Sequence, residues 1–376
     1  MTEFRSEGNP TRSIVHIAPR YPPGLGGVEK VVQYLARNQY ELGMRVMVVT
    51  SDQGRNELRQ EDEPFPVSRL KSATIAHTPV IPNLLPQLLR LDRGSIIHLH
   101  LSRAYTPEMV WMYARLRSHP YLAHWHGPGG PSGRVGFLFR AYMPLMLRLV
   151  LRGAATVVVF THEQRSFVSA KFGVDPARIA VIPNGVDNTF LYADQRLPHS
   201  KPRLLFVGRL VVQKNLPLFL RALDGVSEKF ETTLVGEGEL EAELKEVVDD
   251  LRLQNVRFHG LAQGADLKEL YRRADVFVLP SSWEGMPLVL LEALGMGLPI
   301  VATDIPGNRD LVAHGQNGVL VPPGDPSALR QALLSVTGDV DTYRRMSETS
   351  RRLARKYSWE TVSAEFERLY AQPSMR

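Results

Sequence analysis

Short apolar runs rich in β-branched residues alternate with helical patterns along most of the chain, and this alternation constrains the fold more than any other feature. Such runs are typical of parallel strands, which are buried on both faces because crossover helices cover them. The first series lies at 14–18, 45–50, 96–101, 121–125, 155–160 and 179–183. The second lies at 203–208, 232–236, 256–260, 276–280, 299–303 and 318–322. The pattern predicts an α/β fold with two doubly wound parallel sheets.

The two series are separated by a polar segment at 187–202 that has no apolar period. A chain of 376 residues also exceeds what one hydrophobic core usually supports. We therefore predict an N-terminal domain over 1–187, a C-terminal domain over 188–357 and a final helix within 358–376. Two doubly wound domains would face each other across a cleft, the usual place for an extended ligand. Whether the final helix packs back on the N-terminal domain stays open.

Composition excludes several kinds of site. The chain has no cysteine, which rules out disulfides, thiolate chemistry and cysteine zinc ligands. The net charge of +6 suits anionic ligands such as nucleotide phosphates, but it does not indicate a nucleic-acid partner. The N-terminus lacks the apolar run of a signal peptide, and no stretch is long enough to span a membrane. We expect a cytoplasmic protein.

Two glutamates stand in an unusual setting. Pro287 suits the first position of a helix, so Glu284 is expected in the preceding loop and Glu292 inside the helix. The neighbours of Glu292 are all apolar, and a helix that is apolar all round is buried. A carboxylate in that setting is destabilising unless it accepts hydrogen bonds. Two interpretations remain: a structural carboxylate bonded to nearby backbone, or a carboxylate that binds hydroxyl groups of a ligand.

The spacing of these glutamates matches the E-x7-E motif of the retaining GT4 glycosyltransferases, which have the GT-B fold of two Rossmann-like domains. Five further motifs occur in the order of that family: GGVE at 26–29, HG at 126–127, IPNGVD at 182–187, FVGRLVVQKN at 206–215 and LVGEGEL at 234–240. Nearly the whole chain resembles this family. The resemblance implies transfer of a hexosyl-type sugar from a nucleotide-sugar to an acceptor hydroxyl in glycan, glycolipid or natural-product biosynthesis. It implies no cofactor and no metal; UDP-sugars are the first choice of donor, with GDP- and ADP-sugars open.

The resemblance also assigns roles to individual residues. Glu284 would accept hydrogen bonds from the donor sugar, and Glu292 would hold the ribose hydroxyls. Arg209 and Lys214 would neutralise the diphosphate, because fixed cations stabilise a departing nucleoside diphosphate. His126 would contact the reacting sugar, which makes it a catalytic candidate beside Glu284, Arg209 and Lys214. The other donor-binding candidates are Gly26, Gly27, Gly208, Gly236, Gly285, Met286, Pro287 and Leu288, and the acceptor-cleft candidates are His100 and Gly127.

Four histidines form two H-x-H pairs at the ends of predicted strands, His98 with His100 and His124 with His126. Residues at i and i+2 share one face of a strand, so a metal site is geometrically conceivable. No carboxylate accompanies the pairs at ligand spacing, and the GT4 family is generally metal-independent. We therefore expect no metal.

The segment 134–152 mixes large apolar residues with arginines. It could lie on an anionic membrane surface at the inner face, or it could be a packed helix whose arginines face water.

Two rival functions are also considered. One is a nucleotide-sugar epimerase or hydrolase of the UDP-GlcNAc 2-epimerase type, and the other is a non-catalytic sugar-nucleotide-binding protein. The order of the motifs favours the transferase.

Overall fold

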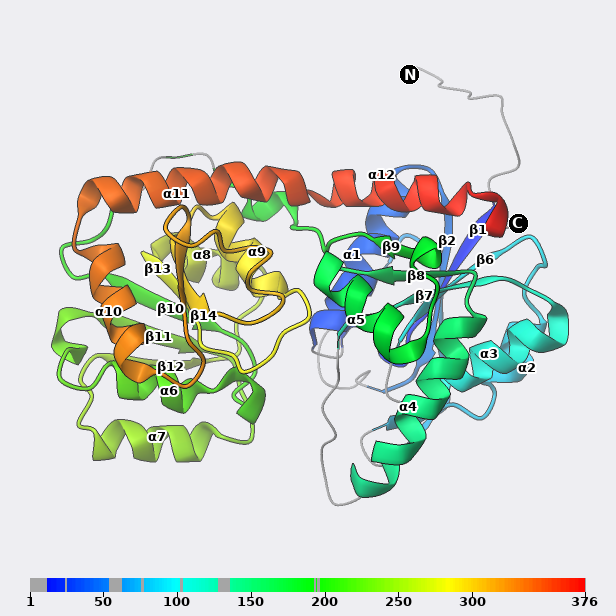
Figure 1. The fold of residues 1–376 in the computed structure, drawn as a ribbon, viewed down its shortest axis with the longest axis horizontal. Coiled ribbons are helices and arrows are strands. Elements are labelled where there is room, and N and C mark those ends of the chain that lie inside the picture. The colour runs from blue at the N-terminus through cyan, green and yellow to red at the C-terminus, as the bar shows by residue number, and fades with distance from the viewer. Residues whose placement is uncertain are drawn as a thin grey trace. The chain divides into compact units, whose positions relative to one another are not determined.

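The structure is a computed structural model that describes residues 12–23, 26–53, 63–75, 78–101, 104–127, 136–192, 194 and 197–375 (Figure 1). The side chains of 136–141, 143 and 374 lie outside this description. The chain forms two compact units. The first comprises residues 1–182 and 363–376, and the second comprises residues 183–362.

The first unit is built on a seven-stranded parallel sheet with the strand order β3-β2-β1-β6-β7-β8-β9. The strand β1 is followed by β2 on one side and lies beside β6 on the other. The strand order therefore reverses between β1 and β6, which makes this position the topological switch point of the sheet. The sheet strands are β1 Ser13–Ile17, β2 Arg45–Ser51, β3 Val67–Leu70, β6 Ile96–His100, β7 Tyr121–His124, β8 Thr156–Val159 and β9 Ile179–Val181. The helices are α1 Gly27–Glu41, α2 Leu84–Leu89, α3 Thr106–Arg117, α4 Gly136–Gly153 and α5 His162–Phe172.

Three short strands of this unit carry no apolar run and were not predicted. β3 lies at the sheet edge with half-exposed residues. β4 (Ala73–Ile75) and β5 (Thr78–Val80) form a separate antiparallel pair, and β4 is exposed throughout. Strands at an edge need only one apolar face or none, so the β-branched pattern that marks the central strands is missing from them.

The second unit is built on a six-stranded parallel sheet with the order β12-β11-β10-β13-β14-β15. Here the strand order reverses between β10 and β13, which is the topological switch point of this sheet. All six strands match the second predicted series: β10 Arg203–Val207, β11 Glu231–Val235, β12 Val256–Gly260, β13 Val276–Leu279, β14 Ile300–Thr303 and β15 Gly318–Val321. The helices are α6 Leu216–Ala222, α7 Glu241–Asp250, α8 Gly264–Arg273, α9 Leu288–Gly295, α10 Pro326–Thr337 and α11 Val340–Ala354.

The chain enters the second unit at residue 183 rather than at 188, and it leaves at 362 rather than at 357. The reason is contact rather than composition: the Asn184 side-chain amide donates to the Met286 carbonyl at 2.8 Å, and Val186 forms a β-bridge with Ser358. The final helix, α12 (Trp359–Tyr370), contributes its second half to the first unit. There the Tyr370 hydroxyl bonds to Gln39 and His98, so this half packs on the first sheet.

Candidate functional site

The candidate site of the second unit lies at the carboxyl ends of β10 and β13, at the topological switch point of the sheet. Ligands of open α/β sheets bind at this kind of position, beside the carboxyl ends of the strands. The loop after β10 and the loop after β13 meet here, and the Ser282 amide donates to the Gln213 carbonyl at 2.8 Å. The candidates from Gly208 to Lys214 and from Glu284 to Leu288 therefore lie in two adjoining loops.

Lys214 and Glu284 are brought into direct contact. The Lys214 Nζ lies 2.6 Å from the Glu284 Oε1, and the two side chains are only 12% and 7% exposed. Gln213 donates to the Glu284 Oε2 at 3.4 Å and to the Trp283 carbonyl at 2.9 Å. The family resemblance assigned these two charges to different parts of a ligand, whereas here they neutralise each other. Arg209, directly after Gly208, is exposed.

Glu292 is buried inside α9, with 4% exposure. Its Oε2 accepts a hydrogen bond from the Tyr271 hydroxyl at 2.8 Å. Sequence reasoning missed Tyr271, which comes from α8 and is stacked on Phe277. The expected structural partner was backbone, but the observed partner is a side chain. The helix itself is apolar as predicted and begins at Leu288, with Pro287 as its N-cap.

Two glycines hold the loops close together. Gly236, after β11, has a φ of 130°, and a Cβ on it would lie 2.0 Å from the Gly208 carbonyl oxygen. Gly307 was not a candidate from the sequence. Its φ is 85°, and a Cβ there would lie 2.5 Å from the Gly285 oxygen and 3.1 Å from the Glu284 oxygen. The absence of a side chain at Gly307 therefore allows its backbone to pack directly against the loop that carries Glu284.

Gly307 and Gly315 offer a matched pair of substitutions. Both have left-handed backbone, with φ of 85° and 76°, so alanine at either position should be destabilising by roughly 1–2 kcal/mol. Gly315 has open space for a Cβ, whereas Gly307 does not. We expect Gly307→Ala to lower donor affinity as well as the melting temperature, while Gly315→Ala lowers only the melting temperature. Calorimetric titration with the donor nucleotide measures this, and equal affinities in both variants would contradict it.

The site of the first unit lies on β1, β6 and β7, where five histidines gather. His16 pairs in register with His98, and His100 pairs with His124. Side chains at matching register positions, and at i+2, lie on one face of a parallel sheet. The predicted H-x-H pairs therefore come together, and His16, which sequence reasoning missed, joins them. The signal for His16 was its place in the first apolar run.

The rings of this histidine cluster (His16, His98, His100, His124 and His126) are hydrogen-bonded to one another. His100 Nε2 lies 2.9 Å from His16 Nδ1, and His100 Nδ1 lies 3.0 Å from His126 Nε2. His98 Nε2 lies 3.2 Å from His124 Nδ1. Neighbouring rings are also stacked, with centroids 4.4 Å apart for His98 and His100 and for His124 and His126.

Burial lowers the pKa of every histidine in the cluster. The pKa of His16 falls to about 4, although its hydrogen bond to the Gln39 oxygen raises it, and the pKa of His126 falls to about 3. Burial, reinforced by neighbouring histidines, lowers the pKa of His98, His100 and His124 well below the usual range. The cluster is therefore neutral at pH 7, and its ring nitrogens act as hydrogen-bond donors and acceptors rather than as cations.

Two sets of three histidines have ring nitrogens within 4.8 Å of one another, His16 with His98 and His100, and His100 with His124 and His126. Neutral imidazoles at such distances have the chemistry to hold a transition metal. Their hydrogen bonds to one another account for the same short distances. That no metal binds here stays a prediction.

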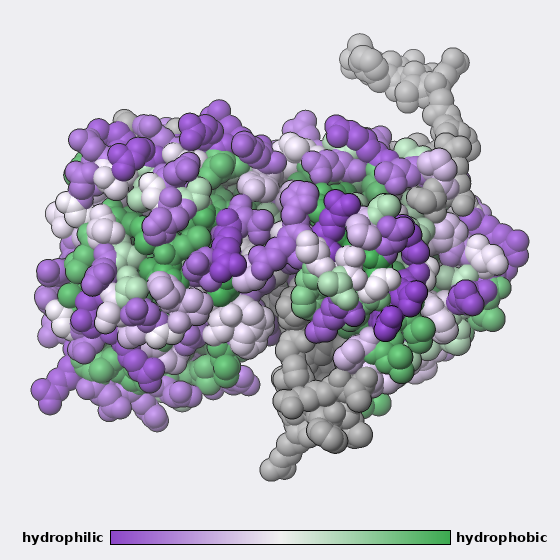
Figure 2. Space-filling model, in the orientation of Figure 1, coloured by the Kyte–Doolittle hydropathy of each residue, from purple (hydrophilic) through white to green (hydrophobic). Residues whose placement is uncertain are grey.

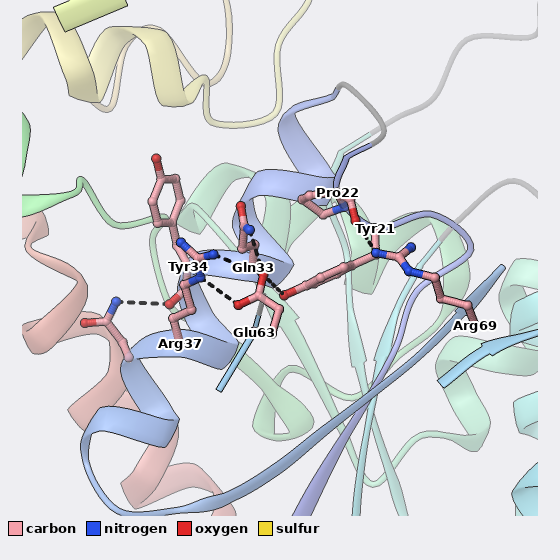
Figure 3. Close-up of polar contacts among 8 residues, drawn as sticks. Tyr21, Pro22, Gln33, Tyr34, Arg37, Glu63 and Arg69 are labelled. Carbon is pink, nitrogen blue, oxygen red and sulfur yellow. Dashed lines mark hydrogen bonds and ion pairs between the residues drawn. The ribbon is translucent and has the colours of Figure 1, made fainter. Parts of the chain in front are cut away.

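The loop after β1 is anchored by a buried carboxylate (Figure 3). Glu63, 5% exposed, accepts hydrogen bonds from Tyr21 at 3.0 Å, Gln33 at 2.7 Å and Arg37 at 2.7 Å. Arg69 donates to the Pro22 carbonyl beside it. These contacts tie Tyr21 to α1 through Glu63, and they tie Pro22 to β3 through Arg69.

The glycine candidates of this unit lie at loop ends. Gly26 is the N-cap of α1 with an extended φ of 173°, and Gly27 is the first residue of that helix. Gly127 follows His126 with a φ of 107°, in the left-handed region that glycine adopts readily. Arg134, at the start of the segment considered either for membrane contact or as a packed helix, lies outside the described residues.

Comparison with known proteins finds two family descriptions on this chain. Residues 26–185 match "Glycosyl transferase 4-like domain", and residues 201–339 match "Glycosyl transferases group 1". The chain is 32% identical over 272 residues to an Escherichia coli protein, UDP-Gal:alpha-D-GlcNAc-diphosphoundecaprenol alpha-1,3-galactosyltransferase, covering 68% of this chain and 69% of that one.

Two further similarities extend over almost the whole chain. One is to a GDP-mannose:cellobiosyl-diphosphopolyprenol alpha-mannosyltransferase of Komagataeibacter xylinus, 26% identical, covering 98% of this chain and 95% of that protein. The other is to the solved structure of Anabaena HepE with UDP and glucose, with a TM-score of 0.80, 19% identity and coverage of 96% and 99%. At that identity the likeness shows the fold, which is the predicted GT-B fold.

Proposed function

The chain belongs to the group 1 glycosyltransferases of the GT4 type, and from that premise we propose that it transfers a hexosyl-type sugar from a UDP-sugar to a lipid-linked saccharide with retention of configuration. The observation that carries the proposal is the pair of carboxylates at the reversal point of the second sheet. Glu284 is held by Lys214, and Glu292 is held by Tyr271. The two side chains are fixed at separate places along the edge where a nucleotide-sugar would lie.

The donor is proposed to be a UDP-sugar. The name of the Escherichia coli relative specifies UDP-Gal, and HepE was solved with UDP. The Komagataeibacter xylinus relative uses GDP-mannose by its name, so GDP is the second candidate for the nucleotide. A thermal-shift screen of UDP, GDP and ADP separates the three, because the ligand that binds tightest raises the melting temperature most. A larger shift with GDP or ADP would replace UDP.

Glu292 is proposed to hold the ribose hydroxyls. Replacing it with glutamine keeps the side-chain volume and an acceptor for Tyr271 but removes the charge. We expect Glu292→Gln to weaken UDP binding by about 10- to 100-fold, since hydrogen bonds to charged groups contribute roughly 1.5–3 kcal/mol. The matched ligand is 2′,3′-dideoxy-UDP, which lacks both hydroxyls and should bind the wild type and the variant equally. A difference that persists with the dideoxy ligand would contradict the assignment.

Retention is proposed because the GT4 resemblance implies it, and front-side attack rather than double displacement is proposed because Glu284 is already engaged. Lys214 and Gln213 both bond its oxygens, so it suits accepting hydrogen bonds from sugar hydroxyls better than attacking the anomeric carbon. The acceptor hydroxyl would then approach from the face that the nucleoside diphosphate leaves, while Arg209 and Lys214 stabilise the departing phosphates. The anomeric signal of the first-formed product, followed by NMR, measures the outcome. A product of inverted configuration would rule this mechanism out.

The acceptor is proposed to be a polyprenyl-diphosphate-linked saccharide at the inner face of the membrane. Two relatives carry such acceptors in their names. Helix α4 packs Leu147, Val150 and Leu151 on the first sheet. Its other face exposes Tyr142, Leu145 and Leu149 beside Arg148 and Arg152. Apolar surface is visible in the region of this helix in Figure 2.

Exposed apolar side chains beside arginines are typical of helices that lie on anionic lipid surfaces. Among the described residues no helix is long and apolar enough to cross a membrane, so the contact we propose is peripheral. Co-sedimentation with phosphatidylglycerol vesicles should retain the wild type and lose Leu145→Glu. Equal sedimentation of both proteins, or of neither, would remove membrane contact through α4 from the proposal.

The decisive test of the overall proposal is an assay of nucleotide release. With a UDP-hexose and a polyprenyl-diphosphate saccharide, we expect UDP release and glycosylated lipid in equal amounts, with or without EDTA. Equal consumption of donor when no acceptor is added would favour the epimerase or hydrolase alternative. Donor binding with no turnover of any acceptor would favour the sugar-nucleotide-binding protein, and loss of activity with EDTA would reinstate a metal.

A further inference from the structure

The histidine cluster continues through two other buried residues, Gln39 of α1 and Tyr370 of α12. His16 Nε2 lies 2.7 Å from the Gln39 Oε1, and the Gln39 Nε2 donates to the Tyr370 hydroxyl at 3.0 Å. The Tyr370 hydroxyl lies 2.7 Å from His98 Nδ1. The two histidine arms, His16–His100–His126 and His98–His124, are thereby joined through a single amide group.

The amide determines which nitrogen of each ring carries the proton. Because the Gln39 oxygen only accepts hydrogen bonds, the His16 Nε2 must donate to it. A neutral His16 then has a bare Nδ1, which must accept from the His100 Nε2–H. By the same step the bare His100 Nδ1 must accept from the His126 Nε2–H. Each contact leaves one choice only, since two protons or two lone pairs cannot share a hydrogen bond.

The tautomers of the second arm, His98 and His124, depend on the NH2 group of the same Gln39 amide. The Gln39 N–H occupies a lone pair of the Tyr370 oxygen, so the Tyr370 O–H is free to donate to His98 Nδ1. Burial raises the pKa of Tyr370, which keeps that proton in place at pH 7. His98 then donates through Nε2 to His124 Nδ1. His124 Nε2, at the end of this arm, is buried and has no partner among the described residues.

We propose that Gln39 and Tyr370 are positioning residues that hold all five histidines of the cluster in the Nε2–H tautomer and so leave Nδ1 of His126 as a hydrogen-bond acceptor. His126 stands at the end of its arm and is half-buried, whereas the other four rings are buried. A bare Nδ1 accepts a hydrogen bond from a sugar or acceptor hydroxyl, and an Nδ1–H could not. Only this functional consequence rests on the proposed function.

The tautomers can be observed directly in the protein without any ligand. Long-range proton–nitrogen NMR of the full chain, labelled with ring-¹⁵N histidine, distinguishes Nε2–H from Nδ1–H for each ring, and single His→Gln replacements assign the signals. We expect all five rings to show Nε2–H at pH 7. A cluster that shows Nδ1–H rings, or tautomers that alternate along an arm, overturns the proposal. So does binding of one equivalent of Zn²⁺ to the purified protein with loss of these N–H signals.

Two substitutions separate the arms. Gln39→Met removes both the acceptor of His16 and the donor to Tyr370, so all five rings should become mixed tautomers. Tyr370→Phe keeps the ring beside Phe366 but removes the hydroxyl, so only His98 and His124 should become mixed, while His16, His100 and His126 keep the Nε2–H tautomer. Gln33→Met is the matched control, because it removes an amide of the same helix that bonds Glu63 outside the cluster (Figure 3). The same response to Gln33→Met as to Gln39→Met would contradict the assignment. If Gln39→Met does not fold, the wild-type tautomers and Tyr370→Phe still decide.

Activity adds a separate readout. If His126 accepts a hydroxyl through Nδ1, kcat/KM of the Gln39→Met variant should fall in proportion to the fraction of His126 left as Nε2–H, because only that fraction is competent. NMR that confirms the tautomers together with unchanged transfer would remove His126 from the proposed function but leave the tautomer assignment standing. NMR that shows the wrong tautomers overturns the inference whatever the transferase assay gives.

Discussion

Replacing Lys214 with methionine should lower kcat/KM for sugar transfer by about 100- to 1000-fold, the range found when one fixed donor to a developing negative charge is removed. The side chain is 12% exposed and is already positioned by Glu284 at 2.6 Å, so its charge is held in place before the donor binds. A preorganised cation in a partly dry site stabilises a leaving diphosphate far more than a mobile surface lysine does. Single-turnover kinetics with saturating acceptor measures the change.

The control for this prediction is Lys245→Met. Lys245 also pairs with a glutamate, Glu241, at 2.7 Å, but it is 54% exposed on α7. We expect its replacement to leave transfer within about twofold, as for ordinary exposed ion pairs. Lys214→Met also leaves Glu284 without its cation, so the double variant Lys214→Met/Glu284→Gln is needed. Strong non-additivity in that cycle would show that the two residues act as a unit. Full activity of Lys214→Met would exclude Lys214 from the mechanism.

Acidification from pH 7 to pH 5 should destabilise the first unit more than any single substitution. The pKa of each histidine in the cluster is lower in the folded state than its usual value near 6.5, which the unfolded chain recovers. The unfolded chain therefore binds more protons between these values. The stabilisation is complete above about pH 6.5 and is lost as the pH falls toward about 4. His16 and His126 account for about 2 kcal/mol each over this pH step, and the lowered pKa of the other three rings adds to the loss in the same direction.

The whole stability of many domains is only about 5–15 kcal/mol, so we expect the melting temperature of the first unit to fall markedly between pH 7 and pH 5. Thermal melts by circular dichroism between pH 7.5 and pH 4.5 measure it. His124→Asn should reduce the slope of the free energy of unfolding against pH by up to about 1.4 kcal/mol per unit near pH 5. His162→Asn makes the same change at an exposed histidine outside the cluster and is the matched control. A melting temperature that is flat from pH 7 to pH 5 would contradict the prediction.

The sequence by itself determined the two sheets, because strands buried on both faces must be continuous apolar runs, and such runs are visible locally. It also located the carboxylates, since a glutamate among the apolar residues of α9 stands out without any structure. The sequence did not predict the short strands β3, β4 and β5 or the limits of the two units. An exposed strand such as β4 has no apolar pattern, and the unit boundary depends on contacts such as that of Asn184 with Met286.

Only the tertiary structure decided which residues of the candidate sites contact each other. Glu292 meets Tyr271, Lys214 meets Glu284, and Gly307 backs the Glu284 loop. Those partners are 21, 70 and 23 positions apart in the sequence, and nothing in their local patterns marks them. The histidine cluster is the extreme case, because Gln39 reaches Tyr370 across 331 positions. Hydrogen bonds act over about 3 Å, so the chemistry of such groups is settled by packing and not by their order along the chain.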